Sequence, residues 1–321
     1  MMNIYQYFKT LPCVVRSATV LIAINILFIQ QSYAQDAIQF SQYFSNQLVI
    51  NPAYAGADDA LSLTMVHRNQ WTGIKGAPRT TTLTGHTLFK NKNTGVGINL
   101  FVDEINIHSQ VSFSGVYSYR IKLNSKSYLS MGLQAGLNYA KSDYASLSGT
   151  LYAANDPGII FEKQSESAFQ FGTGAYYQSN KLEVGLSAPI LFSSGNSLQL
   201  NDSLKRLSTI PHYFLFSRYK VKVSPHVQLN PGFLLKFRSG RPLAIDVNLE
   251  AVLNEVLTFG LSYRSFESIS AIFQLKILPQ MKFGYAYDIP ISSVKRRYFN
   301  SHELMLNYVF AYKNYNVNNP R

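Results

Sequence analysis

The sequence predicts an all-β fold: a transmembrane antiparallel β-barrel of about 14 strands, preceded by a signal peptide. Three observations predict it. The chain opens with a short export-type segment. Apolar and polar residues then alternate with a period of two, and the connections between these segments are alternately short and long.

The first 34 residues have the three parts of a secretory signal peptide. Lys9 and Arg16 supply positive charge, 18–29 is an apolar run of 12 residues, and 32–34 (Ser-Tyr-Ala) places small residues at a cleavage site. The apolar run is too short for a bilayer-spanning helix. We therefore expect cleavage after Ala34 rather than a retained membrane anchor.

Period-two alternation marks the strands, because successive side chains of a strand point to opposite faces. In 127–139, 182–192 and 269–277 every second residue is apolar, and Gly, Ser, Asn or Gln occupies many of the positions between. A soluble β-sandwich also alternates. The segment lengths, close to the 9–11 residues of a tilted transmembrane strand, favour the membrane barrel.

Fourteen strands are expected on this basis, an even number as single-chain bacterial barrels require. They cover 61–70, 79–90, 94–103, 108–122, 127–141, 167–178, 181–192, 211–223, 226–238, 242–252, 256–265, 268–277, 280–288 and 301–313.

The connections support this strand count independently. Every second connection is tight, whereas the long gaps 142–166, 193–210 and 289–300 all fall on the alternate set. Short periplasmic turns and longer outer loops are typical of outer-membrane barrels. We therefore expect strand one to start, and strand fourteen to end, at the periplasmic side.

Composition excludes several classes of protein. Cys13 is the only cysteine and lies in the signal peptide, so the mature chain has no disulfide, cysteine nucleophile or thiolate metal site. Removing two positive charges with that segment lowers the net charge from +12 to +10. Because charged residues are only 14% of the chain, we expect a basic surface near outer-membrane lipid or an acidic partner, and no nucleic acid.

No spaced catalytic or cofactor motif is present. His302-Glu303 lacks the second histidine of a zinc-protease motif, and the other mature histidines (67, 86, 108, 212 and 226) are scattered. The pairs Gly95/Gly97 and Gly172/Gly174 lack a P-loop lysine and are expected to make room for packed neighbours. A barrel hydrolase stays possible, but no serine or histidine is selected by spacing. We expect no enzyme activity, cofactor or metal.

Charged residues of both signs fall on the predicted inward faces. Two readings are open: an internal salt-bridge network that plugs the lumen, which we favour, or a polar conduit. The residues are Arg68, Asp103, Glu183, Lys236, Arg238, Asp246, Glu250, Arg264, Lys276, Lys282 and Asp288.

Residues 35–60 do not alternate and form a polar, aromatic lead-in. This segment could fold into the lumen or contact periplasmic partners, and we expect a tight turn from Asn51 to Gly56 into the first strand. The predicted organisation is a signal peptide (1–34), the lead-in (35–60), the barrel (61–313) and a C-terminal tail (314–321).

Several blocks resemble one family, the PorP/SprF outer-membrane proteins of the type IX secretion system. At the start these are 39–43 (QFSQY), 51–56 (NPAYAG), Arg68-x-x-Trp71 and 76–80 (GAPRT). Near the end, 261–264, 284–288 and 301–306 are similar to the closing strands of the family, whereas 142–210 matches only in length and texture.

The resemblance implies a role that periodicity cannot show. Members of this family from Bacteroidota support secretion and surface attachment of large adhesins, including gliding adhesins. It implies two kinds of partner: the C-terminal domain of a secreted adhesin, and periplasmic ring and motor components of the secretion system. The candidate partner-binding residues, all in the opening blocks, are Asn51, Pro52, Tyr54, Gly56, Arg68 and Trp71. A porin or small-solute uptake channel is the alternative function.

Overall fold

The computed structural model describes residues 40–90, 92–147, 163–195, 211–265, 267–291 and 299–310. The chain divides into two compact units, Met1–Ala37 and Ile38–Arg321, and every described residue belongs to the second. The predicted signal peptide (1–34) and tail (314–321) lie outside the described residues. Among the described residues, no helix has the length and apolar character needed to cross a membrane.

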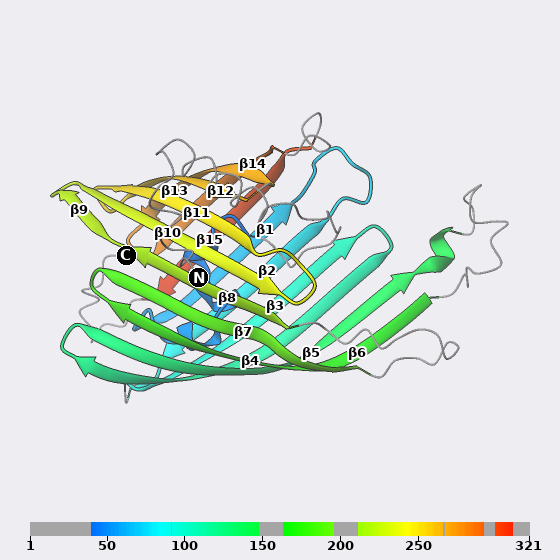
Figure 1. Cartoon of the computed structure of the whole chain (residues 1–321), viewed down its shortest axis with the longest axis horizontal. Coiled ribbons are helices and arrows are strands. Elements are labelled where there is room, and N and C mark those ends of the chain that lie inside the picture. Colours follow the sequence, from blue (N-terminus) through cyan, green and yellow to red (C-terminus); the bar gives the residue numbers. More distant parts are fainter. Residues whose placement is uncertain are drawn as a thin grey trace, which may run out of the picture. The chain divides into compact units, whose positions relative to one another are not determined.

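The second unit is a closed antiparallel barrel (Figure 1). Its strands are β1 (Leu61–Asn69), β2 (Arg79–Leu88), β3 (Thr94–Ile105), β4 (His108–Asn124), β5 (Ser127–Asp143), β6 (Lys163–Ser179), β7 (Leu182–Gly195), β8 (His212–Tyr219), β9 (Val221–Ser224), β10 (Val227–Arg238), β11 (Ala244–Leu253), β12 (Leu257–Arg264), β13 (Ser268–Leu278), β14 (Met281–Pro290) and β15 (Ser301–Phe310). Apart from β8 and β9, strands that are neighbours in sequence pair with each other.

The barrel has 14 strand crossings, as the sequence predicts. β8 and β9 are two parts of one crossing, because both pair with β10 and only Lys220 separates them. The backbone N–H of Lys220 still donates to the carbonyl of Lys181, at 2.7 Å. β1 pairs with β15 and closes the cylinder.

Two strands extend further than the apolar pattern indicates. β5 and β6 each have 17 residues and stay paired as far as Asp143 and Lys163, whose side chains form an ion pair at 3.4 Å. The extra residues are mostly polar, so alternating hydrophobicity does not mark them. The long gap predicted at 142–166 is therefore shorter, and its described part contains the short helix η4 (Tyr144–Leu147).

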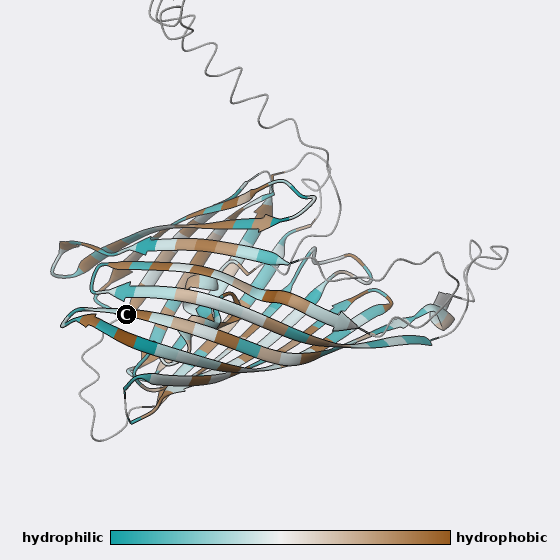
Figure 2. Cartoon of the chain, turned by 60° about the horizontal axis from the view of Figure 1, so that its bottom comes forward, coloured by the Kyte–Doolittle hydropathy of each residue, from teal (hydrophilic) through white to brown (hydrophobic). Residues whose placement is uncertain are grey.

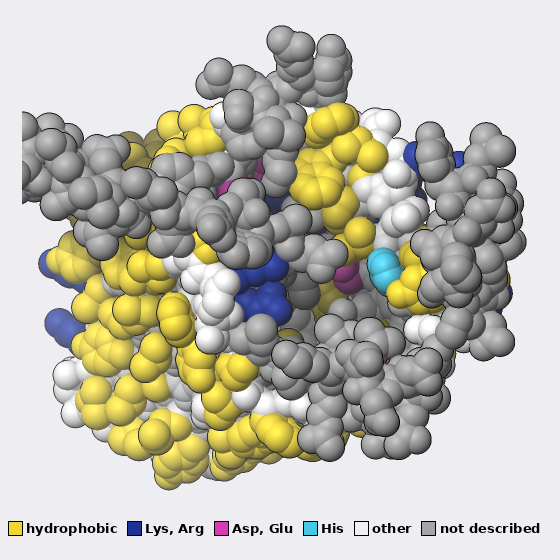
Figure 3. Space-filling model, turned by 45° about the vertical axis from the view of Figure 1, so that its right-hand side comes forward, with side chains coloured by type: hydrophobic (Ala, Val, Ile, Leu, Met, Phe, Trp, Pro, Cys, Tyr) yellow, Lys and Arg dark blue, Asp and Glu magenta, His cyan; other side chains and the backbone are white. Residues whose placement is uncertain are grey.

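The outward face is apolar, as expected for strands that contact lipid. Met131, Leu133 and Leu137 of β5 are exposed by 60%, 47% and 63%. Figure 2 shows hydrophobic and hydrophilic residues alternating along the strands. Figure 3 shows hydrophobic side chains over the outer wall and charged ones inside the mouth. Large exposed apolar surface of this kind would make a soluble protein aggregate, so it indicates a lipid-facing wall.

One predicted outward residue, Ala188, is instead 4% exposed. The pairing of β7 with β8 shifts between Ser187 and Ile190. Pro189 lies in this interval and has no N–H to contribute to the ladder, so a bulge forms and interrupts the alternation. The Pro189 carbonyl accepts a bond from the Gln134 side chain at 2.6 Å.

The two ends of the barrel differ. The tight connections 89–93, 125–126, 180–181, 225–226, 254–256 and 279–280 share one end, which we name the turn end and which lies at the left of Figure 1. The other end is the loop end. Much of the predicted long outer loops, namely 148–162, 196–210 and 292–298, lies outside the described residues.

The buried core lies inside the barrel and is built around Phe40–Ala60, which we name the plug. It contains three short 3₁₀ helices: η1 (Tyr43–Ser45), η2 (Gln47–Val49) and η3 (Pro52–Tyr54). Its apolar side chains pack against inward-facing Phe216, Val66 and Met305. The sequence left two positions open for the lead-in 35–60, namely the lumen or contact with periplasmic partners. The described part, residues 40–60, lies in the lumen.

Candidate functional site

The plug begins at the loop end, where a buried carboxylate holds its backbone. Glu303 of β15 accepts bonds from the backbone N–H groups of Ser41 and Gln42, at 2.8 and 2.9 Å. Arg68 of β1 lies 3.1 Å from the same carboxylate and also pairs with Asp288 of β14. The Ser41 hydroxyl donates to Asp288 at 2.8 Å. The first plug residues are therefore bound to three wall strands that meet only in the folded barrel.

The ion pairs continue around the wall from Arg68. Asp246 of β11 lies 2.8 Å from Lys236 of β10 and 3.4 Å from Arg264 of β12. Arg264 also lies 3.9 Å from Asp288. We name these four residues (Asp246, Lys236, Arg264 and Asp288), together with Arg68 and Glu303, the loop-end network. Buried pairs of this kind contribute little net stability, but removal of one partner costs several kcal/mol.

Tyr43 stands beside this network. Its hydroxyl donates to the Asn248 side chain at 2.9 Å. Burial raises the pKa of Tyr43 well above its usual value, and the nearby carboxylates of Asp246 and Glu250 raise that pKa further. The phenol therefore stays neutral and acts as a hydrogen-bond donor.

A second ion-pair group holds the middle of the plug. Glu183 of β7 lies 2.6 Å from Arg218 and 2.8 Å from Lys220, and it accepts a bond from the Gln47 side chain at 3.1 Å. The Arg218 guanidinium also lies over the Phe44 ring, 5.0 Å from its centroid. Gln47 thus contacts β7, and Phe44 contacts the neighbouring strand β8.

The last part of the plug, Asn51–Asp59, is held mainly by hydrogen bonds and close packing; we name it the plug base. The Asn51 side chain caps η3 by accepting from Ala53 N–H at 2.9 Å, and it donates to the Ala175 carbonyl at 3.0 Å. Tyr54 donates to Asp58 at 3.0 Å, and Asp59 pairs with Arg120 at 2.7 Å.

Inward-facing glycines form the surface on which the plug base lies. A β-carbon added at Gly132 would lie 2.2 Å from the backbone nitrogen of Ala53, and one at Gly95 would lie 2.1 Å from the carbonyl oxygen of Ala55. A side chain at Gly174 would meet the Asn51 amide at 2.1 Å. The glycines of the predicted pairs do make room for packed neighbours. For Gly95 and Gly174 the neighbour is the plug, whereas for Gly172 it is the backbone of Pro189 in β7.

The six candidate partner-binding residues separate into three groups. Asn51, Pro52, Tyr54 and Gly56 lie together in the plug base and are buried. Arg68 belongs to the loop-end network. Trp71 lies in the 70–78 loop, where its backbone N–H donates to the Ser301 hydroxyl at 3.2 Å. Since five of the six are buried within this chain, a role in partner binding stays a prediction, and it would act through the position of the plug.

The eleven charges predicted to face inward do so, but they line the lumen rather than fill it. The plug occupies the space between them. Glu303 and Arg218 also belong to these ion pairs, and sequence reasoning missed both. Glu303, considered in the sequence only as part of an incomplete zinc-protease motif, is fully buried. Its place at an inward position of the last strand was the available signal.

His302 is hydrogen-bonded to Tyr285, at 2.7 Å between its Nδ1 and the hydroxyl. Within the described ranges, no three His, Cys, Asp or Glu side chains gather in a way that could hold a metal ion.

The fold and the buried lumen define a class: an outer-membrane-type β-barrel whose lumen is filled by its own N-terminal segment. Among solved structures, the monoaromatic hydrocarbon channel TodX, as a deltaS2S3 mutant, has a TM-score of 0.51 at 9% identity, covering 83% of this chain and 94% of that one. The toluene transporter TbuX of Ralstonia pickettii has a TM-score of 0.50 at 10% identity, covering 82% and 93%. At such identities the likeness shows the fold alone.

The family is shown by a direct match. Residues 32–308 match the model of the type IX secretion system membrane protein family PorP/SprF. The chain belongs to this family and is a membrane protein. No curated protein matches the sequence.

Proposed function

We propose that this protein is an outer-membrane component of the type IX secretion system that supports secretion and surface attachment of large adhesins of the gliding type. In this proposal the loop end binds the C-terminal domain of the adhesin, and the turn end contacts the periplasmic machinery. Residues 1–34 direct export and are removed. Membership of the PorP/SprF family supports the assignment of the protein to the type IX secretion system.

The observation that carries the proposal is the occupied lumen. The plug bonds to strands on every side of the barrel, from Glu303 on β15 to Ser187 on β7, which donates to the Ile50 carbonyl at 2.5 Å. A filled barrel is suited to hold a partner at the membrane rather than to pass solutes. Loops on a rigid scaffold commonly carry recognition, so the loop end is the natural adhesin-binding side.

Deletion of the gene tests the proposal. We expect the adhesin to disappear from the cell surface, measured by antibody labelling of intact cells, and to reappear when the wild-type gene is restored. An unrelated outer-membrane protein, labelled in the same cells, controls for general membrane damage. Normal adhesin display in the deletion strain would contradict the proposal.

The alternative, a small-solute channel, makes a different prediction in a planar bilayer. We expect the purified protein to show no stable open conductance, because the plug fills the lumen. A steady, voltage-independent conductance would favour the channel.

A further inference from the structure

The lumen near the turn end contains more positive than negative charge. Five cations occupy inward positions of β8, β9, β13 and β14 or the residue that joins two of them, and three carboxylates lie near them: Glu183, Glu250 and, in the turn between β11 and β12, Glu255. Glu183 already binds Arg218 and Lys220, and Glu250 lies 3.9 Å from Arg218. The remaining three cations are Lys222, Lys276 and Lys282.

Lys276 and Lys282 are direct cross-strand partners, and both face inward. Their orientation follows from their neighbours: Gln274, two residues from Lys276, donates to the plug residue Gln42, and Lys282 itself contacts the Ser45 hydroxyl at 3.4 Å. Like charges placed opposite each other on one face of a sheet are destabilising. This arrangement therefore has a cost that packing inside the barrel does not explain.

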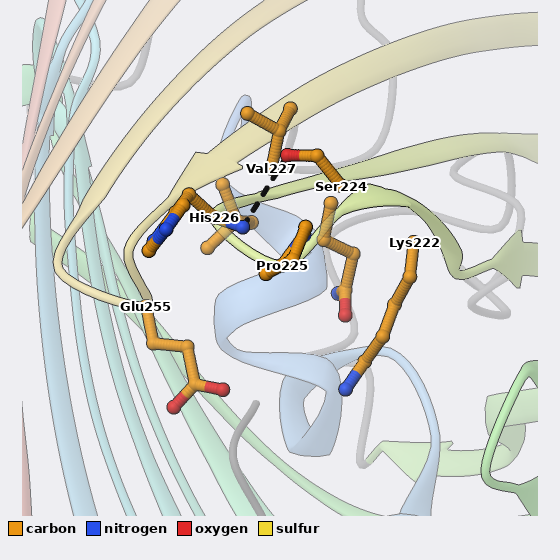
Figure 4. A pocket seen from close by; sticks show the side chains of 8 residues that line it. Lys222, Ser224, Pro225, His226, Val227 and Glu255 are labelled. Atoms are coloured by element: carbon orange, nitrogen blue, oxygen red, sulfur yellow. Dashed lines mark hydrogen bonds between the residues drawn. The ribbon is translucent and has the colours of Figure 1, made fainter.

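Lys222 extends the same positive surface on the other side of the mouth. It follows Lys220 by two residues on the inward face and lines a small hollow of about 30 Å³ at the turn end, with His226 and Glu255 (Figure 4). Figure 4 shows Lys222 and Glu255 on opposite sides of this hollow. Within the described residues, none of Lys222, Lys276 and Lys282 forms an ion pair.

The loop end shows that charge excess is not a general property of this lumen. There, Arg68, Lys236 and Arg264 face Asp246, Asp288 and Glu303, and each of these three cations has a carboxylate within 4 Å. Arg238, the fourth inward cation of this end, forms no ion pair with a described residue. Three of the four inward cations at the loop end are thus paired with carboxylates, whereas only two of the five at the turn end are.

We propose that the turn-end mouth binds an acidic segment of a periplasmic protein, through Lys222, Lys276 and Lys282. The inference rests on the proposed function and deepens it, because it names the chemistry by which the periplasmic machinery is recognised. Anionic lipid is the weaker occupant, since headgroups surround the outer wall and these lysines face the lumen. The C-terminal residues 311–321 carry Lys313 and Arg321 and no acid, so they do not complement the site.

The test uses the purified full-length protein in a nonionic detergent and a fluorescein-labelled peptide of ten glutamates, with binding followed by fluorescence anisotropy. We expect binding at low ionic strength that weakens as salt rises. The triple variant Lys222→Gln/Lys276→Gln/Lys282→Gln should bind about tenfold more weakly, since it removes three positive charges from the inward wall at the turn end.

Two matched variants carry the same change in charge. Lys90→Gln/Lys126→Gln/Lys181→Gln removes exposed lysines from the tight connections of the turn end. Lys75→Gln/Lys141→Gln/Lys163→Gln removes lysines near the loop end. Both should retain binding within about twofold, if the mouth is the site. Equal loss in all three variants, no binding by the wild type, or displacement of the peptide by phosphatidylglycerol vesicles but not by neutral vesicles would overturn the proposal.

Heat-modifiable mobility on gels verifies that each variant is a folded barrel. This test is independent of the test of the proposed function. The purified protein can fail to bind the peptide although the deletion strain loses its surface adhesin, and it can bind the peptide although the deletion strain keeps the adhesin.

Discussion

The two ends of the plug are held by different kinds of interaction. At the plug head, Phe40–Gln42, two backbone amides and a hydroxyl bind carboxylates that Arg68 balances. At the plug base, Asn51–Asp59, backbone atoms lie against glycines of β3, β5 and β6. Charge pairing holds the head, whereas close packing against glycines distinguishes the base, which also has the Asp59–Arg120 ion pair. A buried charge tolerates little loss of its partner, while a packed surface tolerates little added volume.

The largest expected effect comes from removing the central cation of the head. Arg68→Met leaves Glu303 and Asp288 with fewer partners in a buried site, which should lower the free energy of unfolding by about 3–5 kcal/mol. Urea unfolding in detergent, followed by circular dichroism, measures the change. Emission of Trp71, the single tryptophan, should also shift, because its loop follows β1 directly.

Arg68→Lys is the matched control. It keeps the charge and should recover part of the lost stability, although an ammonium cannot reproduce the two-sided contacts of the guanidinium. Unchanged stability in Arg68→Met would show that the head is not held by charge.

An intermediate effect is expected at the base. Gly132→Ala places a methyl group where the Ala53 backbone lies, so the plug base must shift, at a cost of about 1–3 kcal/mol. We expect lower stability together with transient conductance steps in a planar bilayer. Gly115→Ala is the control, because an added β-carbon there meets nothing within 4 Å. Equal behaviour of the two variants would mean that the base does not depend on close packing.

The smallest effect concerns Tyr43 and depends on pH. Its folded-state pKa is raised above the unfolded value of about 10, so its contribution is present below about pH 10 and is lost as pH rises through the folded pKa. Tyr43→Phe should therefore be less stable than the wild type by about 1 kcal/mol at pH 8. This difference should shrink above about pH 10.

Unfolding curves of both proteins at several pH values measure that difference, and ionisation of lysines common to both cancels. A gap that widens at high pH would contradict the raised pKa.

The strands could be read from the sequence because their signal is local. Each transmembrane strand has lipid on one side, so its outward residues must be apolar whatever the other strands do. The polar ends of β5 and β6, at Asp143 and Lys163, need no apolar outward residues. The alternation of apolar and polar residues therefore ends there before the strands do. At Pro189 a missing hydrogen-bond donor shifts the register, and the simple alternation wrongly places Ala188 outside.

The plug could not be placed from the sequence. Phe40–Ala60 has no periodicity, and its position depends on glycines and carboxylates that come from strands up to 262 residues away, as in the bond from Ser41 to Glu303. The motif residues Asn51, Tyr54 and Gly56 stood out as a pattern, but nothing in the pattern distinguishes contact with a partner from contact with the barrel wall.

The sequence by itself determined the membrane-barrel class, the number of strand crossings and which residues face lipid, because alternation and turn spacing are properties of neighbouring residues. Only the tertiary structure decided that the lumen is filled, that Glu303 and Arg218 complete its ion pairs, and that most inward cations are paired at the loop end but fewer at the turn end. Those properties depend on which inward faces meet across the closed barrel, and closure brings together residues that no local pattern connects.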